Sequence, residues 1–129
     1  GHYEESGMHG DEVPDIDNWL KETEFDDNRR FEFIKAKITN KTILDFGCGI
    51  GGFLDKSKQS ADKVAGIELE IALQTSFKKR GLNVFLNLSA AKENNQKYDI
   101  ITAFHVVEHL QDPKSILKDL SELLAGGVR

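Results

Sequence analysis

Four glycines fall within the six residues 47–52, directly after the short apolar run Thr42–Phe46. The residues that follow have helical periodicity as far as about residue 61. One face of this helix carries Phe53, Leu54, Ser57 and Ala61. A strand that passes through glycines into a helix is typical of the first crossover of a parallel sheet. This junction constrains the fold more than any other feature of the chain.

The rest of the chain repeats the alternation of strand and helix. Expected strands cover residues 42–46, 63–67, 83–87 and 98–104, and expected helices cover 51–61, 69–80 and 89–93. A last helix opens at Asp112, its N-cap, with Pro113 in its first turn, and Gly126 ends it. Such alternation produces parallel strands joined by right-handed crossovers. The sequence therefore predicts an α/β fold with a doubly wound, mostly parallel sheet.

The two ends of the chain differ in pattern from its middle. Residues 1–25 contain glycine, proline and acid without periodicity, so we expect a flexible leader whose first two residues are typical of a cleaved tag. The folded domain is expected at 26–129 and begins with an amphipathic helix capped by Asp26 or Asp27. Its apolar residues are Phe31, Phe33, Ile34 and Ile38. A fifth strand would begin at Val128, where the chain stops.

Composition excludes several classes of protein. The chain has 129 residues, of which 39% are apolar and 30% charged, enough for one globular core. A net charge of −5 argues against non-specific binding of nucleic acid. The longest apolar runs are too short for a membrane span. Cys48 is the only cysteine, which excludes an internal disulfide and a cysteine-based zinc site and fits a cytoplasmic protein.

Asp45 limits what the glycine segment can bind. Gly47, Gly49 and Gly52 match the G-x-G-x-x-G pattern, which fits a dinucleotide site and allows the backbone to approach a ligand closely. A carboxylate two residues before the first glycine would repel a pyrophosphate and would favour an ammonium or a sulfonium. S-adenosylmethionine carries both. The alternatives are a plain turn, and an Asp45 that accepts hydrogen bonds from the loop's own N–H groups.

A second acid, Glu68, ends the expected second strand, 21 positions after Gly47. A carboxylate at this place can accept two hydrogen bonds from ribose hydroxyls. A solvated loop acid is the alternative interpretation. Glu70 is the neighbouring candidate, but it falls inside the start of the next helix.

Three motifs, LDFGCGIGG, VAGIELE and YDIITAFHVVEHLQDP, resemble those of class I (Rossmann-like) S-adenosylmethionine-dependent methyltransferases. The resemblance covers roughly residues 26–129 and is nearest to the subgroup with ubiquinone-biosynthesis and other small-molecule methyltransferases. It implies strand order 3-2-1-4 with a stub of strand 5. It also implies that the full-length parent methylates a small molecule. This chain would mainly bind the cofactor, because later segments normally complete the acceptor wall.

The resemblance also implies a role for individual residues. Backbone at Gly47, Gly49 and Gly51 would cradle the methionine part of the cofactor. Asp45 would face its amino group, directly or through water, and Glu68 would bind the ribose.

Further residues are implied for the adenine and for the methionine ammonium. The adenine would lie beside Leu88, Ser89 and Ala90. The carbonyl of Ala103 or Phe104 would approach the ammonium. Many relatives carry an Asp after strand 3 for the adenine amino group, whereas this chain has Asn87 and Ser89.

His105, Glu108 and His109 follow the expected fourth strand at the mouth of the crevice. Methyl transfer needs an aligned nucleophile, and a histidine near its ordinary pKa is a suitable base, so His105 is the catalytic candidate. It could instead only line the cofactor pocket. The H-x-x-E-H spacing resembles a metal-binding segment of some relatives, but the match is imperfect and we expect no metal.

Two other functions remain open from the sequence. The chain could bind a nucleoside cofactor without chemistry, or it could belong to an NAD-dependent oxidoreductase, which Asp45 disfavours. The fourth strand, normally interior, would form a sheet edge in this chain, so self-association is expected.

Overall fold

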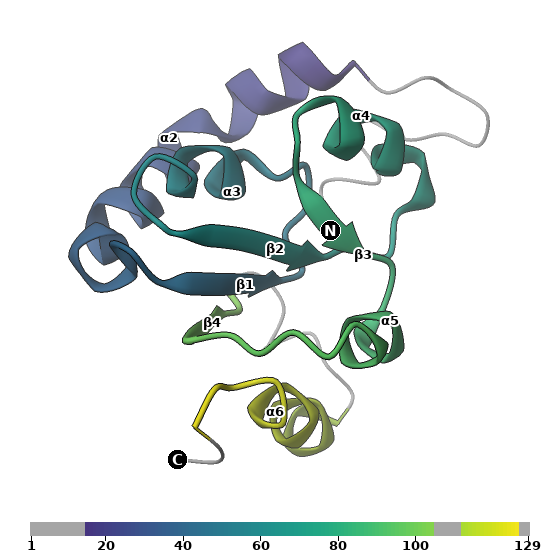
Figure 1. Cartoon of the computed structure of the whole chain (residues 1–129). Helices are drawn as coiled ribbons and strands as arrows, with labels where there is room; N and C mark the ends of the chain where they lie inside the picture. Colours follow the sequence, from purple (N-terminus) through teal and green to yellow (C-terminus); the bar gives the residue numbers. More distant parts are fainter. Residues whose placement is uncertain (1–14, 105–111, 127–129) are drawn as a thin grey trace.

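The computed structural model describes residues 15–104 and 112–126 (Figure 1). Its helices are α2 (Ile16–Ile38), α3 (Gly52–Ser57), η1 (Ile71–Leu73, a 3₁₀ turn), α4 (Gln74–Lys79), α5 (Leu88–Glu93) and α6 (Pro113–Ser121). Its strands are β1 (Thr42–Phe46), β2 (Lys63–Ile67), β3 (Asn83–Phe85) and β4 (Ile100–Thr102). The strands form one parallel sheet of order β3-β2-β1-β4, which confirms the predicted fold class and strand order.

Helices cover both faces of the sheet, as the apolar character of its strands requires. Figure 1 shows α2, α3 and α4 on one face and α5 and α6 on the other. Neighbouring residues of β1 serve the two faces in turn. Ile43 packs among side chains of α2 and α3, whereas Leu44 packs with Tyr98 and with Leu120 of α6. This arrangement places the carboxyl ends of β1, β2 and β3 side by side.

Helix α2 begins at least eleven residues earlier than predicted. Its N-cap is Asp15, whose Oδ1 accepts the N–H of Asn18 at 3.1 Å, rather than Asp26 or Asp27. The prediction of a flexible leader is therefore wrong for residues 16–25. The physical reason is Trp19, which is 5% exposed and belongs to the same core cluster as Leu54 of α3 and Phe77 of α4. Residues 1–14 lie outside the described part of the chain.

The apolar stripe of α2 is also narrower than predicted. Phe31, Ile34 and Ile38 are buried. Phe33 is 78% exposed because, two residues after Phe31, it lies on the opposite side of the helix. Asp27, which was expected at the helix start, instead lies in its middle and is buried.

Several elements are shorter than the sequence suggested. The bounds of β1 and β2 agree with the prediction, but β3 stops at Phe85 because Asn87 already caps α5, accepting the N–H of Ala90 at 2.8 Å. Before β4, the backbone of Tyr98 pairs with the segment after α6 instead of extending the strand. Helix α3 ends at Ser57 rather than near residue 61.

The last helix begins at its predicted N-cap but ends five residues before Gly126, at Ser121, with Glu122 as its C-cap. Asp112 accepts the N–H of Ser115 at 3.2 Å, whereas Gly126, with a positive φ of 79°, lies in the turn after the Leu124 bridge to Tyr98. The expected fifth strand at Val128 lies outside the described residues. Within residues 15–104 and 112–126, no helix combines the length and the apolar character that a membrane span requires.

Candidate functional site

A cavity of about 460 Å³ opens where β1, β2 and β3 end. The carboxyl edge of a parallel sheet is where α/β folds bind their ligands. The lining is mostly apolar and comprises Phe46, Gly47, Ile67, Glu68, Leu69, Asn87, Leu88, Ser89 and Ile116. Four residues predicted for the site are thus brought together in the lining of one cavity: Gly47, Glu68, Leu88 and Ser89.

The N–H groups of the glycine loop are directed into the protein. Those of Gly47 and Cys48 donate to the carbonyl of Ile67 at 2.9 and 3.1 Å. That of Gly49 donates to Glu68 Oε1 at 3.0 Å. A pyrophosphate is bound by backbone N–H groups that point at it. Because these three N–H groups already have partners at the end of β2, the loop is poorly suited to a dinucleotide.

Glu68 links the glycine loop to the cavity. Its Oε1 accepts from Gly49, and its Oε2 accepts the N–H of Glu70 at 3.0 Å. A carboxylate has about four acceptor directions, so these two bonds leave capacity for a ligand. The side chain is half-buried in the cavity wall, which contradicts the alternative of a solvated loop acid. Glu70 instead lies at the N-terminus of η1.

Asp45 lies at the end of β1 and is only 2% exposed. Its Oδ1 accepts the hydroxyl of Thr102, on the neighbouring strand β4, at 2.7 Å. Asp45 does not accept hydrogen bonds from the N–H groups of Gly47, Cys48 and Gly49, because these donate to Ile67 and Glu68. Burial raises the pKa of Asp45 to about 7, although the Thr102 hydrogen bond and then the charge of Arg30 act in the opposite direction. A buried carboxyl group with a pKa so close to neutral pH is typical of a functional site.

Helix α2 brings two further charges to this end of the site, and the sequence analysis missed both. Arg30 lies 5.6 Å from the centroid of the Phe104 ring, which meets Phe53 edge-on at 5.2 Å. Arg30 lowers and Asp27 raises the pKa of Asp45, so all three charges share one neighbourhood. The sequence did contain a signal for these two residues: Asp27 and Arg30 are three positions apart and have the same helical spacing as the buried apolar residues of α2.

Comparison with known proteins identifies this arrangement. A family profile described as a methyltransferase domain matches residues 18–129, most of the chain. The chain belongs to that methyltransferase family.

Relatives of the methyltransferase domain include two ubiquinone biosynthesis O-methyltransferases. That of Hydrogenovibrio crunogenus is 38% identical over 109 residues, which cover 76% of this chain and 45% of the relative. That of Pseudoalteromonas translucida is 30% identical over 125 residues, covering 88% and 52%. The chain therefore spans about half the length of these curated relatives.

Solved structures support the fold of the methyltransferase domain. A sugar N-methyltransferase from a Streptoalloteichus species superposes with a TM-score of 0.69 at 15% identity, covering 95% of this chain and 55% of that one. Coclaurine N-methyltransferase, solved with N-methylheliamine and S-adenosylhomocysteine, superposes with a TM-score of 0.61 at 18% identity, covering 77% and 32%.

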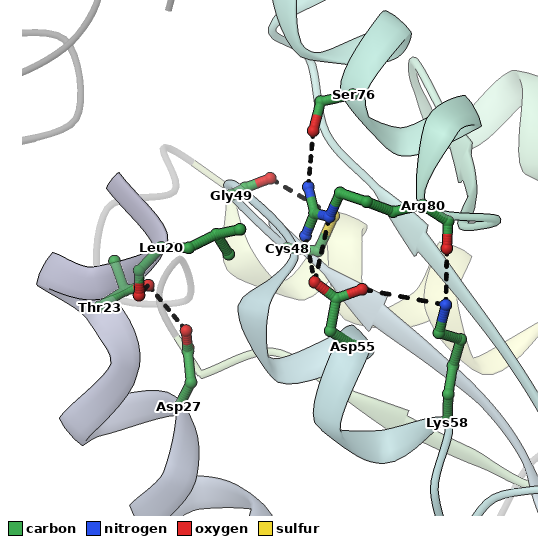
Figure 2. Close-up of polar contacts among 9 residues, drawn as sticks. All are labelled: Leu20, Thr23, Asp27, Cys48, Gly49, Asp55, Lys58, Ser76 and Arg80. Carbon is green, nitrogen blue, oxygen red and sulfur yellow. Dashed lines mark hydrogen bonds and ion pairs between the residues drawn. The ribbon is translucent and has the colours of Figure 1, made fainter. Parts of the chain in front are cut away.

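The glycine loop of the methyltransferase domain is braced from behind. Gly51 has φ of +87°, and a Cβ there would lie 3.0 Å from Leu82 and 3.2 Å from Arg80, so this glycine serves packing. Figure 2 shows Arg80 reaching from the end of α4 to Asp55 of α3, with Nη2 at 2.6 Å and Nε at 3.1 Å from Oδ2. This ion pair fixes the helix that follows the loop.

The remaining predicted residues of the methyltransferase domain lie apart from the cavity lining. Ala90 is half-buried in α5, and Ala103 is half-buried just after β4. Phe104 is 36% exposed beside Arg30. The catalytic candidate His105 and the H-x-x-E-H segment to which it belongs lie outside the described residues.

Proposed function

We propose that this methyltransferase domain binds S-adenosylmethionine in the 460 Å³ cavity, and that its full-length protein methylates a small-molecule acceptor. The observation that carries the proposal is the bond between Gly49 N–H and Glu68 Oε1. It joins the glycine loop to a ribose-binding acid and at the same time uses an N–H that a pyrophosphate would need. The names of the relatives, ubiquinone biosynthesis O-methyltransferases, favour a small acceptor.

The nucleoside would occupy the apolar part of the cavity. We assign the two unused acceptor directions of Glu68 to the ribose hydroxyls. The adenine would lie against Leu69 and Leu88, with Ser89 and Ala90 at its edge. The side-chain oxygen of Asn87 already accepts the Ala90 N–H, so the Ser89 hydroxyl is our candidate for the adenine amino group.

The methionine part would extend toward the buried acid at the end of β1. Asp45 would neutralise its ammonium, directly or through water, with help from the carbonyl of Ala103 or Phe104. Backbone at Gly47, Gly49 and Gly51 would follow its chain. We propose that the carboxylate of the cofactor's methionine part pairs with Arg30 of α2. The positive charge of Arg30 lies close enough to Asp45 to lower the pKa of Asp45.

For methyl transfer, the main task of the chain is to align the acceptor with the methyl group of the cofactor. Bound S-adenosylmethionine supplies an electrophilic methyl carbon on a sulfonium. We propose that His105 takes the proton of the acceptor as that acceptor forms its bond to the methyl carbon and the carbon–sulfur bond breaks. We propose no metal. A cytoplasmic location and self-association through β4 are further expectations of this account.

Binding of S-adenosylhomocysteine should weaken about tenfold between pH 8 and pH 6. Only the ionised form of Asp45 attracts the ammonium, and with a pKa of about 7 that form falls from most of the protein to about a tenth of it. The groups that act on this carboxyl are Thr102 from β4, Arg30 and Asp27 from α2, and Glu68 after β2. Calorimetric titration at both pH values checks this.

The control for this pH dependence is 5′-methylthioadenosine, which carries the nucleoside and the thioether but no ammonium. Its affinity should stay constant within about twofold over the same range. Equal pH dependence for both ligands would remove Asp45 from the site.

A calorimetric comparison of S-adenosylhomocysteine with NAD tests the proposed cofactor. The former should bind at least about 100-fold more tightly, since NAD would bring its pyrophosphate to a loop whose N–H groups are occupied. Equal or tighter binding of NAD would favour the oxidoreductase instead. Methyl transfer by the full-length protein would distinguish an enzyme from a non-catalytic binding module.

A further inference from the structure

Asp27 is a buried acid in the middle of a helix, and the proposed site leaves it unexplained. It is 5% exposed, and its Oδ2 accepts the hydroxyl of Thr23 at 2.8 Å (Figure 2). Burial raises its pKa, while Thr23 and then Arg30 lower it. A buried carboxyl costs stability unless its surroundings compensate for lost water, so its presence on the inner face of α2 calls for a reason.

The carboxyl of Asp27 rests against the backbone of Gly52, the first residue of α3. A Cβ at Gly52 would lie 2.9 Å from Asp27 Cγ and closer still to its Oδ2. Any side chain at this position would therefore push α2 away from the helix that follows the glycine loop. The contact sets how deeply α2 sits over the loop.

Arg30 lies one turn further along α2, so its position depends on how closely α2 packs against the loop. Its guanidinium is 5.6 Å from the ring centroid of Phe104, and this ring in turn packs edge-on against Phe53, the residue after Gly52. Asp27 thus meets the start of α3 and Arg30 meets the segment after β4, and the Phe53–Phe104 contact joins these two segments. A shift of α2 at Asp27 would move Arg30 relative to Asp45.

We propose that Asp27 is a positioning residue for the cofactor: it seats α2 on Gly52 and thereby holds Arg30 at the methionine end of the site. This inference rests on the proposed function. It predicts an effect restricted to the amino-acid part of the cofactor, because the proposed ribose and adenine residues lie just after β2 and on α5, which Asp27 does not contact.

The test compares two ligands across an Asp27→Ala variant. S-adenosylhomocysteine should bind about tenfold more weakly, whereas 5′-methylthioadenosine, which lacks the amino acid, should change less than about twofold. The matched control is Asp26→Ala, since Asp26 is an exposed neighbour paired only with Arg29 among the described contacts. It should leave both affinities unchanged. A similar fall for both ligands would overturn the inference.

Two further variants keep the inference testable if Asp27→Ala folds poorly. Thr23→Val removes only the hydrogen bond that orients the carboxyl and should weaken S-adenosylhomocysteine about two- to threefold, again without effect on 5′-methylthioadenosine. An Arg30→Ala/Thr23→Val double variant should bind no more weakly than Arg30→Ala alone, because the two changes act through one contact. Additive losses would contradict the inference.

The outcomes separate this inference from the proposed function. If the unaltered chain binds neither ligand, the proposed function itself fails. If it binds both and the variants weaken both equally, only the positioning role of Asp27 is lost.

Discussion

Replacing Asp45 with Asn should stabilise the unliganded protein at pH 8 by up to about 4 kcal/mol while weakening the binding of S-adenosylhomocysteine about 10- to 150-fold. The side chain is 2% exposed, and its pKa rises from 3.8 to about 7. At pH 8 the folded protein therefore buries a charge that Asn would not carry. The amide keeps the shape and can still accept the Thr102 hydroxyl.

The pH dependence of this stabilisation follows from the direction of the pKa change. An acid with a raised folded-state pKa contributes most stability when protonated, below pH 3.8, and loses that contribution as the pH rises through about 7. The difference between Asp45→Asn and the unaltered chain should therefore grow from pH 5 to pH 8. Urea unfolding at both pH values measures it, with the exposed Asp62→Asn as control.

The same substitution should remove the attraction for the methionine ammonium. A charge-assisted hydrogen bond contributes about 1.5–3 kcal/mol, which corresponds to the stated loss of affinity. Higher stability together with weaker binding is the combination expected of a functional acid held in an unfavourable place. Unchanged affinity for S-adenosylhomocysteine would show that Asp45 has only a structural role, in its contact with β4.

Glu68→Ala should weaken S-adenosylhomocysteine by about 1–3 kcal/mol, roughly 5- to 150-fold. The variant loses the proposed ribose acceptor and leaves the N–H groups of Gly49 and Glu70 without their carboxylate. Glu70→Ala is the matched control, because it keeps the backbone N–H that Glu68 binds. Calorimetry on the three proteins makes the comparison.

A second ligand separates the ribose role of Glu68 from its role in holding the loop. 2′,3′-Dideoxyadenosine lacks the 2′- and 3′-hydroxyls that Glu68 would bind, so it should bind the unaltered chain more weakly than adenosine does and lose little further affinity in Glu68→Ala. If both nucleosides lose the same factor, Glu68 acts only by fixing the glycine loop.

Local patterns were sufficient to predict the strands that carry the site. Both β1 and β2 are short apolar runs ended by a change of composition, so their bounds could be read directly. The first half of α2 was missed although Ile16, Trp19 and Leu20 have the i, i+3, i+4 spacing of a helix, because this pattern is short and only Trp19 of residues 16–26 is buried. The anchoring of this stretch depends on its packing with side chains of α3 and α4, which a local pattern does not report.

The partners of the site's charges were harder to predict than their positions. Asp45 was expected at the end of β1, but its partner Thr102 is 57 residues away and is brought near only by the pairing of β1 with β4. Arg30 and Asp27 were missed because a charged residue on a helix is usually solvated. Asp27 is buried against Gly52 and half-buried Arg30 lies against Phe104, and both of these contacts are far away in the sequence.

The location of the bound nucleoside is the most direct test of the account. A second cavity of about 390 Å³ lies at the opposite edge of the sheet, lined in part by Thr42, Lys63 and Asn83. In a ¹⁵N NMR titration with S-adenosylhomocysteine, the amides of Gly49 and Glu68 should shift most. Shifts confined to Thr42, Lys63 and Asn83, with the carboxyl edge unchanged, would contradict it.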